Sequence, residues 1–135
     1  MQSAHDLTAQ TLGYYNQNAQ VFADSTVDVE FSATQDAFVP LLLPGARVLD
    51  LGCGSGRDDK RFLELGFDVT ATDGSAELAR IASEYAGIPV RHELFCELSD
   101  EDAYDGVWAC SSILHVPKRE LPDVLSRIAR ALRMT

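Results

Sequence analysis

Three glycines spaced two residues apart, Gly52, Gly54 and Gly56, follow directly on a short and mostly apolar run at residues 48–51. Such a run is typical of a buried parallel strand. Glycine lets the chain turn sharply and allows a ligand to lie against the bare main chain. A strand, a glycine turn and a helix start together form the loop on which nucleotide-like ligands bind in parallel α/β sheets. The stretch therefore predicts a nucleotide-type binding site.

Aspartates flank this glycine turn on both sides. Asp50 comes just before it, and Asp58 and Asp59 come just after it. A pyrophosphate would be repelled here, because Arg57 is the one cation nearby in the sequence. The third glycine also comes one residue earlier than in the dinucleotide pattern G-x-G-x-x-G. S-adenosylmethionine carries a sulfonium, an ammonium and a single carboxylate, which the loop amides and the helix N-terminus can bind. The flanks therefore favour S-adenosylmethionine over NAD.

A further aspartate, Asp73, lies 21 positions after Gly52, at the predicted end of the next strand. A carboxylate at this place can accept hydrogen bonds from both ribose hydroxyls, in either family of cofactor. The alternative is that Asp73 caps the following helix. The residue thus indicates an adenosine ligand without specifying the chemistry.

The elements that must position these side chains alternate along the chain. Apolar periodicity and turn residues predict helices at residues 8–24, 28–43, 58–65, 75–86 and 121–132, with strands at 47–51, 67–72, 88–92 and 107–110. Pro40 is expected to shorten the second helix, and Pro122 fits the first turn of the last. Strands alternating with helices predict an α/β fold with a parallel sheet and right-handed crossovers.

Composition limits the partners. The chain has 135 residues, 46% of them hydrophobic, and a formal net charge of −10. One globular domain without nucleic-acid or membrane binding is expected, because both need a basic or apolar face. Cys53, Cys96 and Cys110 lack metal-ligand spacing, so we expect no metal site and reduced thiols in a cytoplasmic protein without a signal peptide. The acidic run at residues 100–102 is interpreted as a solvated loop.

The motif Asp50-Leu51-Gly52-Cys53-Gly54-Ser55-Gly56 resembles the first motif of the class I S-adenosylmethionine-dependent methyltransferases. Other stretches resemble the tellurite-resistance branch of that class: YYNQNA at 14–19, GRD at 56–58, GFDVTATDGS at 66–75 and YDGVWACSSILHVP at 104–117. The resemblance implies a Rossmann-like, doubly wound parallel sheet whose first four strands have the order 3-2-1-4. It implies one domain over residues 1–135, with a lid helix at 1–28 and a partial core at 29–135.

The same resemblance implies roles for particular residues. The methionine part of the cofactor would lie along Asp50, Gly52, Cys53 and Gly54. The ribose would be held by Asp73, with Gly74 and Ser75 beside it. Residues Phe95 and Cys96 fall where the adenine is contacted in the family, and Ala109 and Cys110 would face the cofactor near the sulfonium. In the lid helix, Tyr14 would lie nearest the ligand.

One histidine, His115, follows the fourth predicted strand and is the candidate catalytic residue. It could orient an acceptor or take a proton near neutral pH; equally, it could pack at the start of the last helix. A general base is optional, since methyl transfer mainly requires an acceptor held in line and shielded from water.

The sequence stops where the family continues through a glycine turn into further strands. Strand four would then be an apolar edge, and we expect it to pair with a second copy in a homodimer or the two copies to exchange elements. Three functions follow: methyl transfer to a small molecule, with tellurite- or selenite-type oxyanions as one acceptor class; cofactor binding without turnover; or an NAD-dependent oxidoreductase, which the glycine spacing disfavours.

Overall fold

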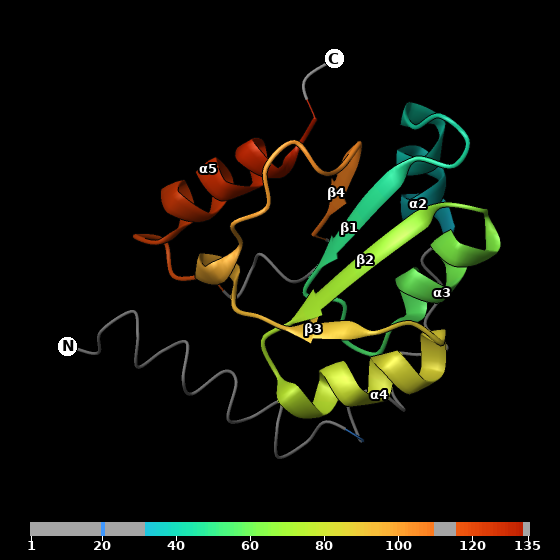
Figure 1. Ribbon diagram of the computed structural model, residues 1–135, viewed down its shortest axis with the longest axis horizontal. Helices are drawn as coiled ribbons and strands as arrows, with labels where there is room; N and C mark the ends of the chain where they lie inside the picture. Colours follow the sequence, from blue (N-terminus) through green and yellow to red (C-terminus); the bar gives the residue numbers. More distant parts are fainter. Residues whose placement is uncertain (1–19, 21–31, 110–115, 134–135) are drawn as a thin grey trace.

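A computed structural model describes residue 20, residues 32–109 and residues 116–133 of the chain. Its centre is a parallel sheet of four strands in the order β3-β2-β1-β4 (Figure 1). The strands are β1 (Arg47–Leu51), β2 (Asp68–Asp73), β3 (Val90–His92) and β4 (Gly106–Trp108). The predicted fold class and strand order are therefore confirmed. The predicted bounds of the first strand are also confirmed, whereas the third and fourth strands are shorter than expected.

Helices cover both faces of this sheet (Figure 1). They are α2 (Ser32–Phe38), α3 (Arg57–Glu64), α4 (Ala76–Ala86) and α5 (Leu121–Ala131), with short 3-10 turns η1 (Val39–Leu41) and η2 (Phe95–Glu97). As expected, the helix before β1 is short: α2 ends at Phe38, and Pro40 lies in the tighter turn η1 that follows.

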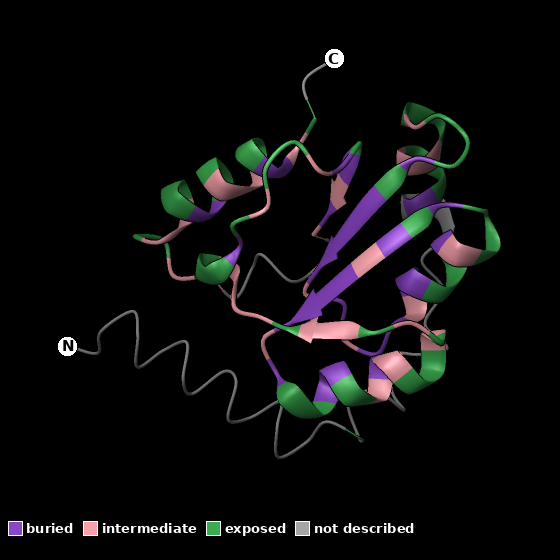
Figure 2. Ribbon diagram, in the orientation of Figure 1, coloured by how far each residue is buried: buried purple, intermediate pink, exposed green. Residues whose placement is uncertain are grey.

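The alternation of side chains along β1 separates two apolar layers. Val48 faces α2 and α3, where Phe38, Phe62 and Trp108 pack with ring centroids 5.0 to 5.8 Å apart. Leu49 points to the opposite face and shares a cluster with residues of α5. All residues of β1 except the exposed Arg47 are buried between the helices of the two faces, which makes β1 the most enclosed strand (Figure 2).

Local signals fix where α4 begins and ends. The Ser75 hydroxyl accepts a hydrogen bond from the Leu78 amide at 3.3 Å, as a helix N-cap does. Gly87 closes the helix in the left-handed conformation, with φ +78°. Gly56 also has a positive φ, +85°, and a Cβ there would lie 3.1 Å from the backbone of Ala82. Glycine at this position therefore lets the start of α3 approach α4 closely.

The edge of the sheet at β4 is approached by the segment that follows α5. Among the described residues, β4 pairs with β1 alone, so it is an edge strand as predicted. Leu132 forms a parallel bridge with Tyr104, and the Arg133 amide donates to the Tyr104 carbonyl at 2.8 Å. These contacts lie just before β4 and leave residues 106–108 without a strand partner on the outer side in the part of the chain that the structure describes.

The loop at residues 100–102 is more structured than its charges suggest. The Asp100 carboxylate accepts hydrogen bonds from the Arg91 guanidinium, the shorter at 3.1 Å, and from the Tyr104 hydroxyl. Burial and the Asp100 charge raise the pKa of Tyr104 to about 12. The interpretation of this run as a wholly solvated loop is therefore wrong for its first residue, which links β3 to the chain before β4.

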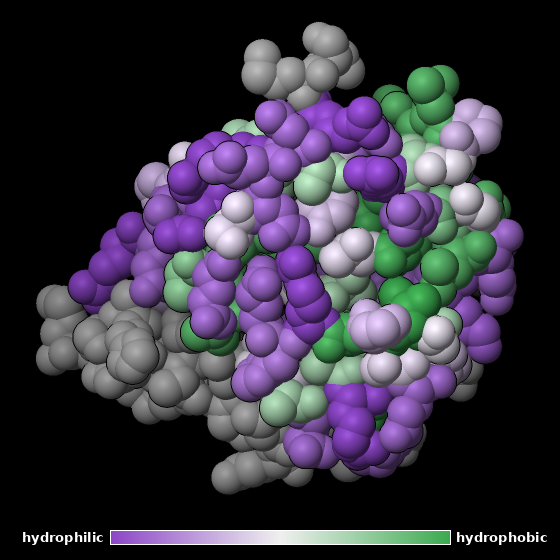
Figure 3. Space-filling model, in the orientation of Figure 1, coloured by the Kyte–Doolittle hydropathy of each residue, from purple (hydrophilic) through white to green (hydrophobic). Residues whose placement is uncertain are grey.

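Apolar side chains also reach the surface. Leu41 and Leu43, in the segment between α2 and β1, are 80% and 81% exposed. That segment lies at the upper right of the view in Figure 3, where hydrophobic atoms gather. No helix among the described residues is long and apolar enough to cross a membrane.

Candidate functional site

The glycine loop after β1 is tied to the end of β2. The amides of Gly52 and Cys53 both donate to the Thr72 carbonyl at 2.9 Å. The Gly54 amide donates to the Asp73 carboxylate at 2.9 Å, and the Gly56 amide donates to the Cys53 carbonyl at 3.1 Å. These four amides are therefore engaged within the protein. The expectation that the loop amides bind a ligand carboxylate fails for these positions, because the loop uses them to hold its own shape.

Asp73 joins this loop to the start of α4. One of its carboxylate oxygens accepts from the Gly54 amide at 2.9 Å and the other from the Ser75 amide at 2.8 Å. The pKa of Asp73 is raised overall, because the effect of burial outweighs these two amides and the charge of His92, which lower it. The N-cap of α4 is Ser75, so the alternative reading of Asp73 as that cap is wrong. Each carboxylate oxygen retains a second lone pair, which fits a role in binding ribose hydroxyls.

Near the loop, two buried carboxyl groups interact with each other and have few hydrogen-bond partners. Asp50 is 2% exposed and Asp59 is fully buried. One oxygen of Asp50 and both oxygens of Asp59 have no partner among the described residues. Burial, followed by the charge of Asp59, raises the pKa of Asp50 well above its usual range, and burial also raises the pKa of Asp59. Cys53 shares the environment, and burial next to these charges raises the pKa of its thiol.

The neighbouring Asp58 has the opposite environment. Its carboxylate accepts from the Gln35 amide at 2.6 Å, from the Trp108 indole at 3.0 Å and from two nitrogens of Arg57 at 3.2 Å. Three elements, α2, α3 and β4, therefore meet at one carboxylate. We call this group, made of Gln35, Arg57, Asp58 and Trp108, the Asp58 hub.

The ends of β3 and β4 complete the same edge of the sheet. The Glu93 amide donates to the Asp73 carbonyl at 3.0 Å, and a ring nitrogen of His92 lies 3.2 Å from the Gly74 carbonyl. Phe95 and Ala109 are half-buried and pack on the same apolar cluster, whereas Cys96 is exposed. The structure thus places Phe95 and Ala109 on one apolar cluster and leaves Cys96, the neighbour of Phe95 in sequence, at the surface. Tyr14, Cys110, His115 and the lid at residues 1–28 lie outside the described residues, except for residue 20.

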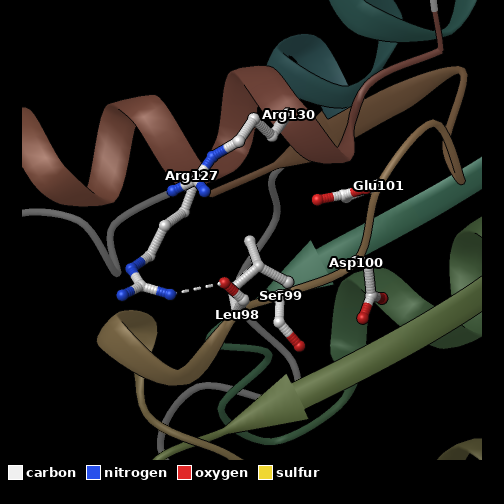
Figure 4. A pocket seen from close by; sticks show the side chains of 6 residues that line it. All are labelled: Leu98, Ser99, Asp100, Glu101, Arg127 and Arg130. Atoms are coloured by element: carbon white, nitrogen blue, oxygen red, sulfur yellow. Dashed lines mark hydrogen bonds between the residues drawn. The ribbon is translucent and has the colours of Figure 1, made fainter.

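A small pocket lies elsewhere, between α5 and the loop after η2. Its cavity volume is about 90 Å³, below the several hundred Å³ typical of cofactor sites. The side chains around it are Leu98, Ser99, Asp100, Glu101, Arg127 and Arg130 (Figure 4). One of the two arginines, Arg127, already donates to the Leu98 carbonyl at 2.9 Å. None of the predicted site residues lines this pocket.

Two features of the site were not anticipated from the sequence. The Thr72 carbonyl anchors the loop, and the Asp58 hub connects residues 23 and 50 positions apart. The GRD stretch marked Asp58 without indicating its partners. No group of three or more histidine, cysteine or acidic side chains in the described segments is arranged to hold a metal ion.

A parallel sheet of order 3-2-1-4, a glycine loop after the first strand and an aspartate ending the second are shared by the doubly wound nucleotide-binding folds, among them the S-adenosylmethionine-dependent methyltransferases. The chain belongs to the methyltransferase domain family, whose model matches residues 48–135. The cofactor of this family is S-adenosylmethionine.

Known proteins agree with this assignment. A ubiquinone biosynthesis O-methyltransferase of Xanthomonas campestris is 35% identical over 82 residues, which cover 56% of this chain and 34% of that protein. The ubiquinone biosynthesis O-methyltransferase of Bordetella avium is 34% identical over 102 residues, which cover 67% of this chain and 39% of that protein. The chain thus spans little more than a third of the length of these curated relatives.

Solved structures share the fold. The 1,6-didemethyltoxoflavin-N1-methyltransferase of Burkholderia thailandensis, crystallised with bound 1,6-didemethyltoxoflavin and S-adenosylhomocysteine, has a TM-score of 0.72 and 29% identity, covering 98% of this chain and 61% of that one. The magnesium protoporphyrin IX methyltransferase of Synechocystis has a TM-score of 0.78, and the match covers 98% of this chain and 74% of that one. Its identity of 18% shows likeness of fold alone.

Proposed function

We propose that this chain binds S-adenosylmethionine at the C-terminal edge of its sheet and serves methyl transfer to a small-molecule acceptor. The observation that carries the proposal is the charge of this edge. The Asp50 and Asp59 carboxyls have oxygens without a donor beneath the glycine loop, and Asp73 lies at the end of the adjacent strand. An anionic dinucleotide is disfavoured here, whereas a ligand with a cationic amino-acid end and a ribose fits.

In this proposal the residues bind and orient the cofactor. Asp73 receives the ribose hydroxyls, and Gly74 and Ser75 lie beside it. Gly52, Cys53 and Gly54 line the methionine part, with Asp50 below them. Bound S-adenosylmethionine supplies an activated methyl group, so the protein mainly has to align the acceptor and exclude water.

The remaining positions would complete the pocket. Phe95 and Cys96 contact the adenine, while Ala109 and Cys110 lie near the sulfonium. Tyr14 closes over the cofactor from the lid helix. His115 orients the acceptor or takes its proton, and packing at the start of the last helix remains its alternative role.

Two acceptor classes are proposed for testing. The resemblance to the tellurite-resistance branch supports an oxyanion of tellurium or selenium. The curated relatives are named as O-methyltransferases of ubiquinone biosynthesis, which supports a hydroxyl group on a quinone precursor. Methyl transfer to an oxyanion should require cationic side chains near the acceptor, whereas transfer to a ring hydroxyl should require an apolar surface against the ring. Assays with both kinds of acceptor therefore distinguish the two classes.

Calorimetry with S-adenosylhomocysteine tests the cofactor. We expect micromolar binding by the wild-type chain, and Asp73→Ala should weaken it about 10- to 100-fold, as expected for loss of a charged acceptor. The exposed Asp68→Ala is the matched control. Binding of NADH but not of S-adenosylhomocysteine would replace the proposal with the oxidoreductase alternative.

Methyl transfer from radiolabelled S-adenosylmethionine to tellurite, selenite and a catechol then tests turnover. His115→Gln should reduce transfer without changing cofactor affinity if His115 acts on the acceptor. Cofactor binding without transfer to any acceptor would favour the cofactor-binding alternative. A cytoplasmic location and a homodimer through the edge of β4 remain proposals; light scattering that gives a monomer at micromolar concentration would exclude the dimer.

A further inference from the structure

The Asp50–Asp59 pair presents an electrostatic problem that the rest of the site does not share. Asp58 has three partner side chains and Asp73 has two backbone amides. Asp59, which is fully buried, has neither among the described residues. Two adjacent buried carboxylates cannot both stay charged at low cost, since each loses water and repels the other.

A shared proton resolves this arrangement. If one carboxyl is protonated, its O–H can donate to the other, and this single hydrogen bond can join two of the three oxygens that lack a partner. Both pKa values are raised, chiefly by burial; the charge of Asp59 raises that of Asp50 further, whereas hydrogen bonding to Asp50 and Cys53 lowers that of Asp59. The proton belongs to the pair, because such coupled groups titrate together.

Among the residues that the structure describes, other charged groups near the pair do not supply the missing counter-charge. Arg57 is bound to Asp58 at 3.2 Å, and the charge of His92 acts on Asp73. The groups that face the pair from the elements packed around it are Cys53 in the glycine loop, Asp58 on α3 and Asp73 on β2, and each of the three is neutral or negative. A cation beside the loop would therefore be the first positive charge that acts mainly on this pair.

We propose that Asp50 and Asp59 share one proton in the cofactor-free chain and release it to solvent when the ammonium group of the cofactor binds beside the glycine loop. The inference rests on the proposed function, since it requires a cofactor with a cationic amino-acid end. A positive charge close to the loop stabilises the doubly ionised pair through a medium of low dielectric constant. Asp59 is then a positioning residue that sets cofactor affinity through Asp50 without touching the ligand.

The consequence is a cofactor affinity that depends on pH. Where the pair still holds its proton, the affinity for S-adenosylhomocysteine should rise with pH by up to about tenfold per unit, the limit for one linked proton. 5′-Methylthioadenosine has the same nucleoside and sulfur but no ammonium group. Its affinity should change little over the same pH range.

Calorimetry in two buffers of different ionisation enthalpy, at the pH where the affinity changes most steeply, counts the released protons directly. S-adenosylhomocysteine is the probe and 5′-methylthioadenosine is the control ligand. We expect the wild type and the exposed control Asp68→Asn to release close to one proton per cofactor. Asp59→Asn, which keeps the shape and removes the acid, should release few or none.

Each result separates the inference from the function on which it rests. Binding of S-adenosylhomocysteine without proton release by the wild type overturns the inference alone, and so does equal release by Asp59→Asn. Release on binding of 5′-methylthioadenosine also overturns it. Absence of S-adenosylhomocysteine binding by the wild type counts against the proposed function instead. If Asp59→Asn does not fold, the comparison of the two ligands on the wild type still decides.

Discussion

Removal of the carboxylate at the centre of the Asp58 hub should destabilise the fold strongly. Asp58→Ala leaves the Gln35 amide and the Trp108 indole without their acceptor, and these side chains are only 4% and 6% exposed. Each buried donor without a partner costs about 1–3 kcal/mol. Arg57 is 19% exposed and can turn to water, so its share is small.

The expected loss is therefore about 3–5 kcal/mol, in the range found when one partner of a buried ion pair is removed. That is a large part of the 5–15 kcal/mol by which domains of this kind are stable. Trp108→Phe keeps an aromatic ring between Phe38 and Phe62 but removes the N–H, and should cost about 2–3 kcal/mol. The exposed Asp68→Ala is the control and should stay within about 0.5 kcal/mol of the wild type.

Urea unfolding followed by far-ultraviolet circular dichroism measures these differences. The double mutant Asp58→Ala/Trp108→Phe gives the coupling free energy between these two residues. We expect it to be about 1–2 kcal/mol, because Asp58 and Trp108 form one hydrogen bond with each other. A cost below about 1 kcal/mol for Asp58→Ala, or a coupling near zero, would show that the carboxylate does not connect these elements as argued.

Three further outcomes are expected. Gly56→Ala should destabilise the fold by about 2–4 kcal/mol, and Gly66→Ala by about 1–2 kcal/mol. Both glycines have a positive φ, but only at Gly56 would a Cβ meet another backbone, at 3.1 Å. Equal losses of stability in urea unfolding would contradict this. Tyr104 should ionise near pH 12 in an absorbance titration, and Tyr104→Phe should remove that late phase; an unchanged titration of the variant refutes the assignment. Because the folded pKa values of Asp50 and Asp59 are raised, the cofactor-free fold binds more protons than the unfolded chain and should lose stability as pH rises above about 4. Asp59→Asn should flatten that profile and add about 1–2 kcal/mol at neutral pH, and a steeper profile in thermal melts would contradict the reasoning.

The parts of the fold that were predictable depend on short-range signals. The strand at residues 47–51 and the helix at residues 75–86 each depend on a few neighbouring residues. The bounds of the strand are confirmed, and the helix runs from the Ser75 N-cap to Ala86, just before Gly87. Asp73 was placed at the end of β2 because its spacing from the glycine loop reflects one strand–helix–strand unit.

The features that were missed depend on contacts distant in sequence. The partners of Asp58 are 23 and 50 positions away, so no local pattern indicates them. The engagement of the Gly52 and Cys53 amides by Thr72 depends on the register of β1 against β2. The acidic neighbours of Asp100 predict a solvated residue, but Arg91 reaches it from another strand. Acceptor choice was beyond prediction for a related reason: its proposed determinant, His115, has no local signal that separates its two roles.

Trp108 is the single tryptophan of the chain, and this gives the protein an intrinsic optical probe. Its indole is buried against two phenylalanine rings, donates to Asp58 and immediately precedes Ala109. Fluorescence excited at the red edge of the absorption band therefore comes from one known place, at the junction of α2, α3 and β4. Changes in the wavelength or lifetime of that emission can follow cofactor titration in the unlabelled protein. No added reporter group then disturbs the site.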